Sequence, residues 1–222
     1  VSHGAKGGKF QEKVTSIWEG KNIGKLNETS YYEQAVSEAE SKWSKQIDKG
    51  YSLTGEPVFR PMLAHNYKDH IKKVKYPFYA QTKLDGLRSY ISWETKPVAR
   101  SRRGKIWKCA DIILSPVYSF LKENPHIILD GEIFTRNIKF QDISSAFKRD
   151  EPNKLTQYIQ FWCYDLYNAK EPEMTFEDRL KLIPDLGGTF KVVQTEIVNS
   201  FNEVLVFHNK VVSDSYEGTI LR

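Results

Sequence analysis

Residues 78–93 read FYAQTKLDGLRSYISW and contain two β-like runs separated by a short polar segment. Aromatic and β-branched residues are enriched in strands, so Phe78–Thr82 and Ser89–Trp93 are predicted to be strands. The segment between them reads Lys-Leu-Asp-Gly-Leu-Arg. Lys83, its first residue, is therefore expected at the end of the first strand or in the turn that follows.

The charged groups of this segment suit phosphate chemistry. Lys83 supplies an amine and Arg88 a guanidinium, so one group could attack phosphorus while the other holds an anion in a fork. A nucleophilic lysine must be neutral, which requires a pKa well below the reference value of about 10.4. Neighbouring cations, bound metal and burial all lower it. The alternative is a plain hairpin with both cations solvated, because Asp-Gly between strands is a common turn.

From about residue 57 onward, short β-like runs alternate with segments of helical apolar spacing. The further predicted strands are Pro97–Ser101, Ile127–Phe134, Tyr158–Leu166, Phe190–Val198 and Tyr216–Leu221. The predicted helices are Pro116–Glu123, with Ser115 at its start, Phe140–Lys148, Phe176–Ile183 and Phe201–Val212. Because these elements lack regular β-α-β alternation, the pattern favours an α+β fold over a doubly wound sheet.

The N-terminal part of the chain is predicted to be a separate small module. Ser30 and Glu33 have the spacing of a capping box and begin a helix that Gly50 is placed to stop. The apolar positions at helical intervals are Val36, Ala39, Trp43 and Ile47. Gly and Pro in Thr54–Pro57 mark a boundary, so the expected domains are residues 1–55 and 56–222.

Composition narrows the class only partly. The chain has 222 residues, 40% of them hydrophobic, and 33 Lys and Arg against 28 Asp and Glu, which gives +5. A basic chain suits a polyanionic partner, although many unrelated enzymes are equally basic. The two cysteines, Cys109 and Cys163, lack the spacing of a paired motif and lie in or beside apolar sequence. They are therefore expected to be buried thiols in a reducing compartment. Without a signal peptide or an apolar run of about 18 residues, the protein is expected to be soluble and intracellular, with no membrane partner.

The segment Lys83–Arg88 resembles the signature of the covalent nucleotidyltransferases, which include DNA ligases, RNA ligases and mRNA capping enzymes. Further elements similar to that superfamily follow in its order. They are Ser101–Gly104, Leu129–Glu132, Phe161–Leu166 and Glu217–Arg222, with Pro61–Ala64 upstream. The resemblance is to ATP-dependent DNA ligases and covers about residues 57–222. It implies an α+β nucleotidyltransferase core with antiparallel sheets, preceded by a small N-terminal module.

The resemblance also implies a reaction. Lys83 would attack the α-phosphate of ATP, expel pyrophosphate and become lysyl-AMP. AMP would then pass to the 5′-phosphate at a nick in double-stranded DNA, and the 3′-hydroxyl would displace it. The nearest alternative is a mRNA-capping guanylyltransferase that uses GTP, and an RNA ligase is a more distant one. The alternative that is not an enzyme is an inactive ligase fragment that only binds DNA.

The resemblance gives several residues a role at the nucleotide. Glu132 would contact the ribose, Tyr164 would stack on adenine, and Gln81 would read the adenine edge. Glu217, with Glu132, would hold Mg²⁺, or Mn²⁺ as an alternative, which suits oxygen ligands and phosphates. From the residues alone, Tyr164 could equally be a core aromatic and Glu217 a surface carboxylate. The nucleotide-binding residues predicted in this way are Gln81, Thr82, Lys83, Leu84, Arg88, Arg102, Glu132, Tyr164 and Arg222.

A basic run provides the predicted DNA contact. Its members are Arg100, Arg102, Arg103, Lys105 and Lys108. Arg102 matches the family arginine that engages the 5′-phosphate of the nick, and its neighbours could hold backbone phosphates. The alternative to a DNA contact is that these cations simply face solvent on one side of a strand, as runs of charged residues usually do.

The two ends of the chain carry weaker predictions. Residues 1–55 partly resemble a WGR-type module, around Trp18–Lys21 and Asp48–Tyr51, and a plain amphipathic helix is the alternative. The chain ends at Arg222, before the lysine pair and the OB-fold that follow in relatives. It is therefore expected to be a truncated or split enzyme that needs a C-terminal segment as a partner for full activity.

Overall fold

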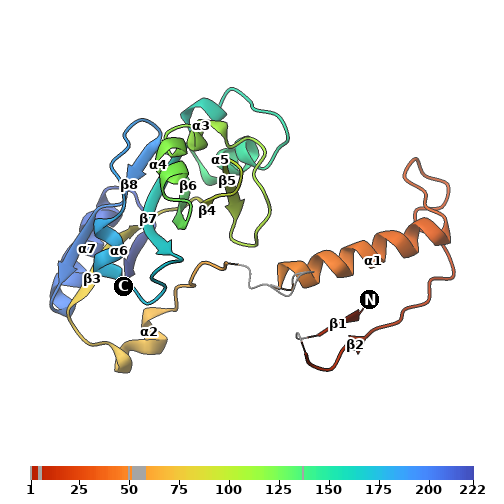
Figure 1. Ribbon diagram of the computed structural model, residues 1–222, viewed down its shortest axis with the longest axis horizontal. Coiled ribbons are helices and arrows are strands. Elements are labelled where there is room, and N and C mark those ends of the chain that lie inside the picture. The colour runs from red at the N-terminus through yellow and green to blue at the C-terminus, as the bar shows by residue number, and fades with distance from the viewer. Residues whose placement is uncertain (1, 5–6, 50, 52–58, 137) are drawn as a thin grey trace. The chain divides into compact units, whose positions relative to one another are not determined.

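The structure, a computed structural model, describes residues 2–4, 7–49, 51, 59–136 and 138–222 (Figure 1). The chain divides into two compact units, residues 1–60 and residues 61–222. The boundary predicted between residues 55 and 56 lies outside the described residues, as does the predicted helix stop at Gly50.

The N-terminal unit contains one long helix and a two-stranded antiparallel ribbon. Strands β1 (Ser2–His3) and β2 (Gln11–Glu12) form the ribbon, and α1 spans Tyr31–Asp48. The predicted capping box at the start of α1 is confirmed, because the Ser30 hydroxyl accepts from the Glu33 amide at 3.2 Å and the Glu33 carboxylate accepts from the Ser30 amide at 2.8 Å. Many large apolar side chains of this unit are exposed, among them Phe10, Val14, Trp18, Ile23, Leu26 and Trp43.

The C-terminal unit contains a five-stranded and a three-stranded sheet. The larger sheet has the order β5 (Pro97–Ser101), β4 (Leu87–Trp93), β6 (Ile127–Phe134), β7 (Gln160–Asn168) and β8 (Phe190–Val192). The smaller sheet has the order β10 (Gly218–Leu221), β3 (Phe78–Lys83) and β9 (Thr195–Val198). All neighbours are antiparallel except β7 and β8, which are parallel. The predicted α+β class with mainly antiparallel sheets is confirmed.

The two strands predicted around the Lys-Leu-Asp-Gly segment exist but do not pair with each other. Strand β3 belongs to the smaller sheet and β4 to the larger one, so the connection crosses between sheets. The hairpin alternative is therefore wrong. Residue Gly86 in this connection approaches β6 closely, because a Cβ added there would lie 2.4 Å from the Ile133 carbonyl oxygen.

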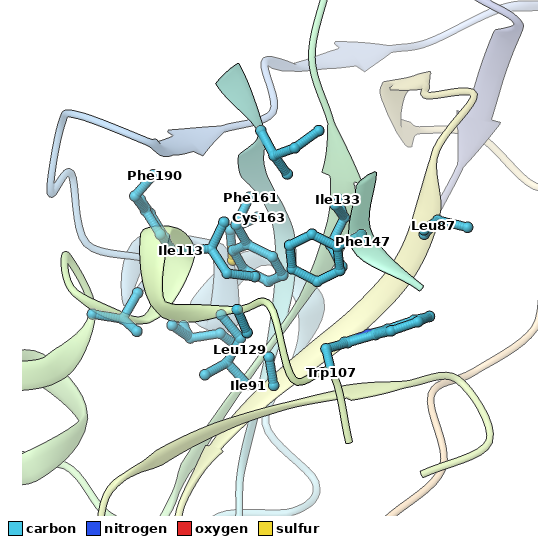
Figure 2. Close-up of a cluster of buried hydrophobic side chains, with 14 of the residues drawn as sticks. Leu87, Ile91, Trp107, Ile113, Leu129, Ile133, Phe147, Phe161, Cys163 and Phe190 are labelled. Carbon is cyan, nitrogen blue, oxygen red and sulfur yellow. The ribbon is translucent and has the colours of Figure 1, made fainter. Parts of the chain in front are cut away.

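Helices cover each sheet and close two hydrophobic cores. The helices α3 (Asp111–Leu114), α4 (Tyr118–Glu123) and α5 (Phe140–Phe147) contribute to the core of the larger sheet. Figure 2 shows Ile113 and Phe147 from these helices beside Ile91, Leu129 and Phe161 of the sheet, and all five are fully buried. Helix α6 (Phe176–Lys181) packs on β7, and α7 (Phe201–Ser213) packs on the smaller sheet. Short helical turns occur at Tyr67–His70, Ile71–Lys73 and Thr156–Tyr158.

Several details of the predicted elements are wrong, including an undivided strand, a helix start and a strand start. Phe190–Val198 is two strands, because the chain passes after Val192 from the larger sheet to the smaller one. Ser115 was predicted to start a helix at Pro116, but it is the C-cap of α3, and α4 begins at Tyr118. The strand predicted from Tyr158 begins at Gln160, after a turn of 3₁₀ helix. The predicted burial of both free cysteines is confirmed. Among the described residues, no helix has the length and apolar character needed to cross a membrane.

Candidate nucleotidyl-transfer site

Lys83 and Glu217 meet where the smaller sheet ends. Lys83 is the last residue of β3 and lies opposite Gly218 of β10, so the register places Glu217 next to it. The Glu217 amide donates to the Lys83 carbonyl at 3.2 Å, and the Lys83 ammonium donates to the Glu217 carboxylate. Their side chains are 42% and 43% exposed. An accessible amine therefore faces a carboxylate that lies 134 residues away in sequence.

Arg88 is fixed at the start of β4 by a two-pronged ion pair. Its Nε and Nη2 atoms donate to the two carboxylate oxygens of Asp130 at 3.2 and 2.6 Å. Asp130 is only 6% exposed, and Arg88 also donates to the Met62 carbonyl. Such forked pairs set the guanidinium plane as well as its position. A buried carboxylate in an apolar strand needs a cation as its partner, and Arg88 provides one for Asp130.

Glu132 lies opposite Arg88 in the register of β4 and β6. Burial raises the pKa of Glu132 to about 8, with Arg88 opposing the shift and Asp130 adding to it. At neutral pH the carboxyl group is therefore mainly protonated and can donate a hydrogen bond. It would ionise when a cation approaches, which suits either a ribose hydroxyl or a metal ion.

Gln81 links the two sheets beneath the site. Its side chain is 1% exposed, and Nε2 donates to the Tyr164 carbonyl at 3.0 Å and to Thr195 Oγ1 at 2.8 Å. Its Oε1 accepts from Arg222 Nε at 2.8 Å. The amide predicted to read the adenine edge is thus engaged by protein groups on both its nitrogen and its oxygen.

Asp165 is the centre of a buried ionic network. It is 7% exposed and accepts from Arg222 Nη1 at 2.9 Å. It also accepts from Arg179 Nε and Nη2 at 2.8 and 3.1 Å, and from the Leu166 amide at 2.8 Å. Arg179 was not among the residues predicted from the sequence. The signal was available, because an aspartate inside the apolar run Phe161–Leu166 requires a cation when buried.

Tyr164 presents its ring to two guanidinium groups. The Cζ atoms of Arg222 and Arg88 lie 5.0 and 5.6 Å from the ring centroid, within the range of cation–π attraction. Burial raises the pKa of Tyr164 well above its usual value, so the phenol is neutral. Of the other predicted nucleotide-binding residues, Leu84 is buried and Thr82 pairs with Thr219 of β10.

The basic run forms the turn that follows β5. Arg102, Arg103 and Lys105 are exposed there, and Gly104 has a φ of 88°, which lets the turn close. Arg100 instead donates to Glu94 at 2.6 Å and to the Gly104 carbonyl at 3.1 Å. Lys108 pairs with Asp150 at 2.8 Å. The structure therefore gathers Arg102, Arg103 and Lys105 in one exposed turn. The charges of Arg100 and Lys108 are compensated by carboxylates.

No ready-made metal cage is found among the described residues, where no group of three or more His, Cys, Asp or Glu side chains is arranged to hold an ion. Glu217, which pairs with Lys83, and Glu132 remain as the candidate carboxylates. Mg²⁺ is commonly held by one or two carboxylates together with substrate phosphates, so this sparse donor set fits that ion.

An accessible lysine at the junction of two sheets, paired with Glu217 and near the Arg88–Asp130 ion pair, is an arrangement that fits the nucleotidyltransferase class that the sequence resembles. The model of the ATP dependent DNA ligase domain matches residues 61–222, and the chain belongs to that family. A DNA ligase of African swine fever virus (isolate Tick/South Africa/Pretoriuskop Pr4/1996) is 26% identical in an alignment 228 residues long, which covers 95% of this chain and 52% of the viral protein. The chain thus spans about half the length of the viral relatives that it matches.

Solved structures share the fold. The structure named Pmar-Lig_PreS3 superposes with a TM-score of 0.65 and 24% identity, over 82% of this chain and 45% of the other. A Chlorella virus DNA ligase-adenylate gives a TM-score of 0.52 and 23% identity, over 74% of this chain and 61% of the other. The predicted DNA-ligase nucleotidyltransferase fold is confirmed.

Proposed function

We propose that this chain carries out the ATP-dependent chemistry of a DNA ligase, with Lys83 as the nucleophile. The observation that carries the proposal is the pairing of an exposed Lys83 with Glu217, beside a fixed Arg88 and a largely protonated Glu132. The chain spans about half the length of its viral relatives. Sealing of nicked DNA, which is the activity of a whole ligase, is therefore also proposed here.

The first step transfers AMP from ATP to the lysine. Neutral Lys83 Nζ attacks the α-phosphorus, a P–N bond forms, the P–O bond to the β-phosphate breaks, and pyrophosphate leaves. The amine gives up its proton to solvent. The lysyl-AMP is then attacked by a 5′-phosphate of nicked double-stranded DNA, and the 3′-hydroxyl finally displaces AMP.

Glu217 and Glu132 would hold the divalent metal, which we expect to be Mg²⁺ with Mn²⁺ as an alternative. A bound divalent ion neutralises charge that develops on the phosphates. In the absence of the metal, burial keeps Glu132 mainly protonated near neutral pH, and it can then hydrogen bond a ribose hydroxyl, as the family resemblance implies.

Tyr164 would stack on the adenine, with the guanidinium groups of Arg88 and Arg222 close to its ring. Thr82 and Leu84 flank the nucleophile and complete the proposed nucleotide site. For Gln81 to read the adenine edge, one of its present contacts with Arg222 or the Tyr164 carbonyl would have to be exchanged for the base.

Arg102, Arg103 and Lys105 would bind phosphates of the nicked duplex, with Arg102 at the 5′-phosphate. Arg100 contributes less in this arrangement, because its charge is already paired with Glu94. A phosphate interface of this kind makes affinity fall steeply as salt is added.

The test is covalent labelling with α-labelled nucleotides in the presence of Mg²⁺. The chain should take label from ATP but not from GTP, and Lys83→Ala should abolish it. Lys122→Ala, an exposed lysine of α4, is the matched control and should label as the wild type does. Preferential labelling by GTP would establish a capping enzyme instead. Salt-sensitive DNA binding without label from either nucleotide would establish an inactive DNA-binding fragment.

A further inference from the structure

Strand β10, which follows Glu217 directly, is tied to the larger sheet at both of its ends. At the far end, Arg222 donates to Asp165 of β7 at 2.9 Å. At the near end, the hydroxyl of Tyr216 accepts hydrogen bonds from the guanidinium of Arg136, which lies two residues after β6. Because Tyr216 and Glu217 are consecutive, the second tie is adjacent to the carboxylate of the candidate site.

The contact between Arg136 and Tyr216, called the clamp below, holds the phenol through both its oxygen and its ring. Arg136 Nε donates to the Tyr216 hydroxyl at 2.8 Å, and Nη2 donates to the same oxygen. The Cζ atom of Arg136 lies 4.7 Å from the ring centroid, within the range of cation–π attraction. The ring of Phe134, the last residue of β6, lies 6.2 Å from the Tyr216 ring, centroid to centroid. The Tyr216 side chain is therefore fixed by groups that belong to the larger sheet.

The backbone around Glu217 transmits this restraint to its side chain. The Tyr216 amide donates to the Val211 carbonyl of α7 at 3.0 Å, and the Glu217 amide donates to the Lys83 carbonyl at 3.2 Å. Two consecutive residues share one planar peptide group. A rotation that moved the Glu217 carboxylate away from Lys83 would therefore also turn Tyr216, and the clamp opposes that rotation.

The two ties of β10 differ in burial. The side chains of Arg222 and Asp165 are only 12% and 9% exposed, whereas Arg136 is exposed and Tyr216 is half-buried. Exposed charged contacts contribute little to the free energy of unfolding. We therefore expect the clamp to affect the local geometry at Glu217 more than the stability of the unit.

From these contacts we infer that Arg136 is a positioning residue for the first chemical step, and that it acts through Tyr216 to hold the Glu217 carboxylate at Lys83. The inference rests on the proposed function, in which Glu217 is required for AMP transfer to Lys83. Loss of the clamp has two consequences of opposite sign. The Lys83 amine loses its partner for part of the time and becomes more available to a reagent, while AMP transfer becomes slower because the carboxylate is out of place.

The first test measures how available the Lys83 amine is when no nucleotide is present. The whole chain is treated briefly with acetic anhydride, digested and analysed by mass spectrometry, with the exposed Lys122 of α4 as the internal reference. An ion-paired ammonium is acylated more slowly than a free amine. Arg136→Gln and Tyr216→Phe should each speed acylation of Lys83 by about three- to tenfold, the range expected for one hydrogen-bonded contact. The double variant should be no faster than either single one, because both changes remove the same contact.

A third substitution shows whether the clamp acts through Glu217. Glu217→Gln removes the carboxylate itself and sets the upper limit of the increase, and adding Tyr216→Phe to it should have no further effect. Arg149→Gln and Tyr118→Phe make the same chemical changes at exposed positions outside the site and should leave the acylation rate unchanged. Unchanged acylation in both clamp variants, or a further increase beyond that of Glu217→Gln, would overturn the inference.

The second test measures lysyl-AMP formation from ATP and Mg²⁺ without DNA. The two clamp variants should lower the rate at saturating ATP by about five- to tenfold. The ATP concentration for half-maximal rate should change less than about twofold, because the nucleotide contacts proposed for Tyr164 and Glu132 are intact. The urea midpoint should move by less than about 0.3 M, since the clamp is partly exposed. A purely structural role would instead lower the urea midpoint and the rate together, and that result would count against positioning.

The outcomes separate this inference from the proposed function. If the wild type takes no label from ATP, the proposed function fails, while the acylation pattern still reports whether Arg136 holds Glu217 at Lys83. A loss in the Arg136 variant that is confined to assays with nicked DNA would overturn the inference, because the guanidinium would then serve the DNA and not the carboxylate.

Discussion

Replacing Asp165 with Asn tests whether the buried network under the site holds the two sheets together. The change preserves shape but removes the negative charge that faces Arg179 and Arg222, whose side chains are only 20% and 12% exposed. Breaking a buried pair by removing one partner costs about 3–5 kcal/mol, and the asparagine oxygen can still accept one of the hydrogen bonds. We therefore expect a loss of about 3 kcal/mol in the free energy of unfolding.

Urea denaturation followed by circular dichroism measures this loss. With a denaturant slope of about 2 kcal/mol/M for a unit of this size, the midpoint should fall by about 1.5 M. Asp150→Asn is the matched control, since it makes the same chemical change in an ion pair with Lys108 that is 63% and 75% exposed. Surface pairs contribute little, so its midpoint should not move measurably. Equal shifts for the two variants would refute the argument that the network stabilises the site.

Three further predictions concern the site itself. Burial raises the pKa of Glu132 from 4.5 to about 8 in the folded chain, so unfolding releases a proton and stability should fall as pH rises through that window. Glu132→Gln should abolish this part of the pH dependence, and urea midpoints at the two ends of the window would show it. Gly86→Ala should reduce labelling by ATP at least tenfold, because its Cβ would lie 2.4 Å from the Ile133 carbonyl and 2.8 Å from Glu132 Cγ; unchanged labelling would contradict the close approach. Arg102→Gln should slow sealing of nicked DNA more than lysyl-AMP formation in paired assays, and the reverse order would place Arg102 at ATP.

Much of the core fold could be predicted from local sequence pattern. The strands at residues 78–83 and 127–134 were predicted within about one residue, because β-branched and aromatic runs flanked by polar residues have little alternative. The capping box at Ser30 was predicted for a similarly local reason. What the pattern could not give was which strands pair. Strand β3 finds its partners in β9 and β10, more than a hundred residues later in the chain, so local spacing suggested a hairpin that does not form.

The candidate site shows the same division. Lys83, Glu132 and Glu217 were found from short motifs, whereas their mutual placement depends on the register of β3 with β10 and of β4 with β6. Gln81 was predicted to face the base, yet its amide is held by groups from β7, β9 and Arg222. Hydrogen-bond partners of a buried amide come from long-range packing, which no spacing rule provides.

Lys83 is the proposed acceptor of AMP, and peptide mapping of the adduct tests this role most directly. The chain is incubated with ATP and Mg²⁺ long enough to detect a slow reaction, digested without acid, and analysed by mass spectrometry. We predict one AMP per chain, on the peptide that contains Lys83, and its loss on acid treatment because the bond is a phosphoramidate. An adduct on any other residue, or one that persists in Lys83→Ala, would contradict the account.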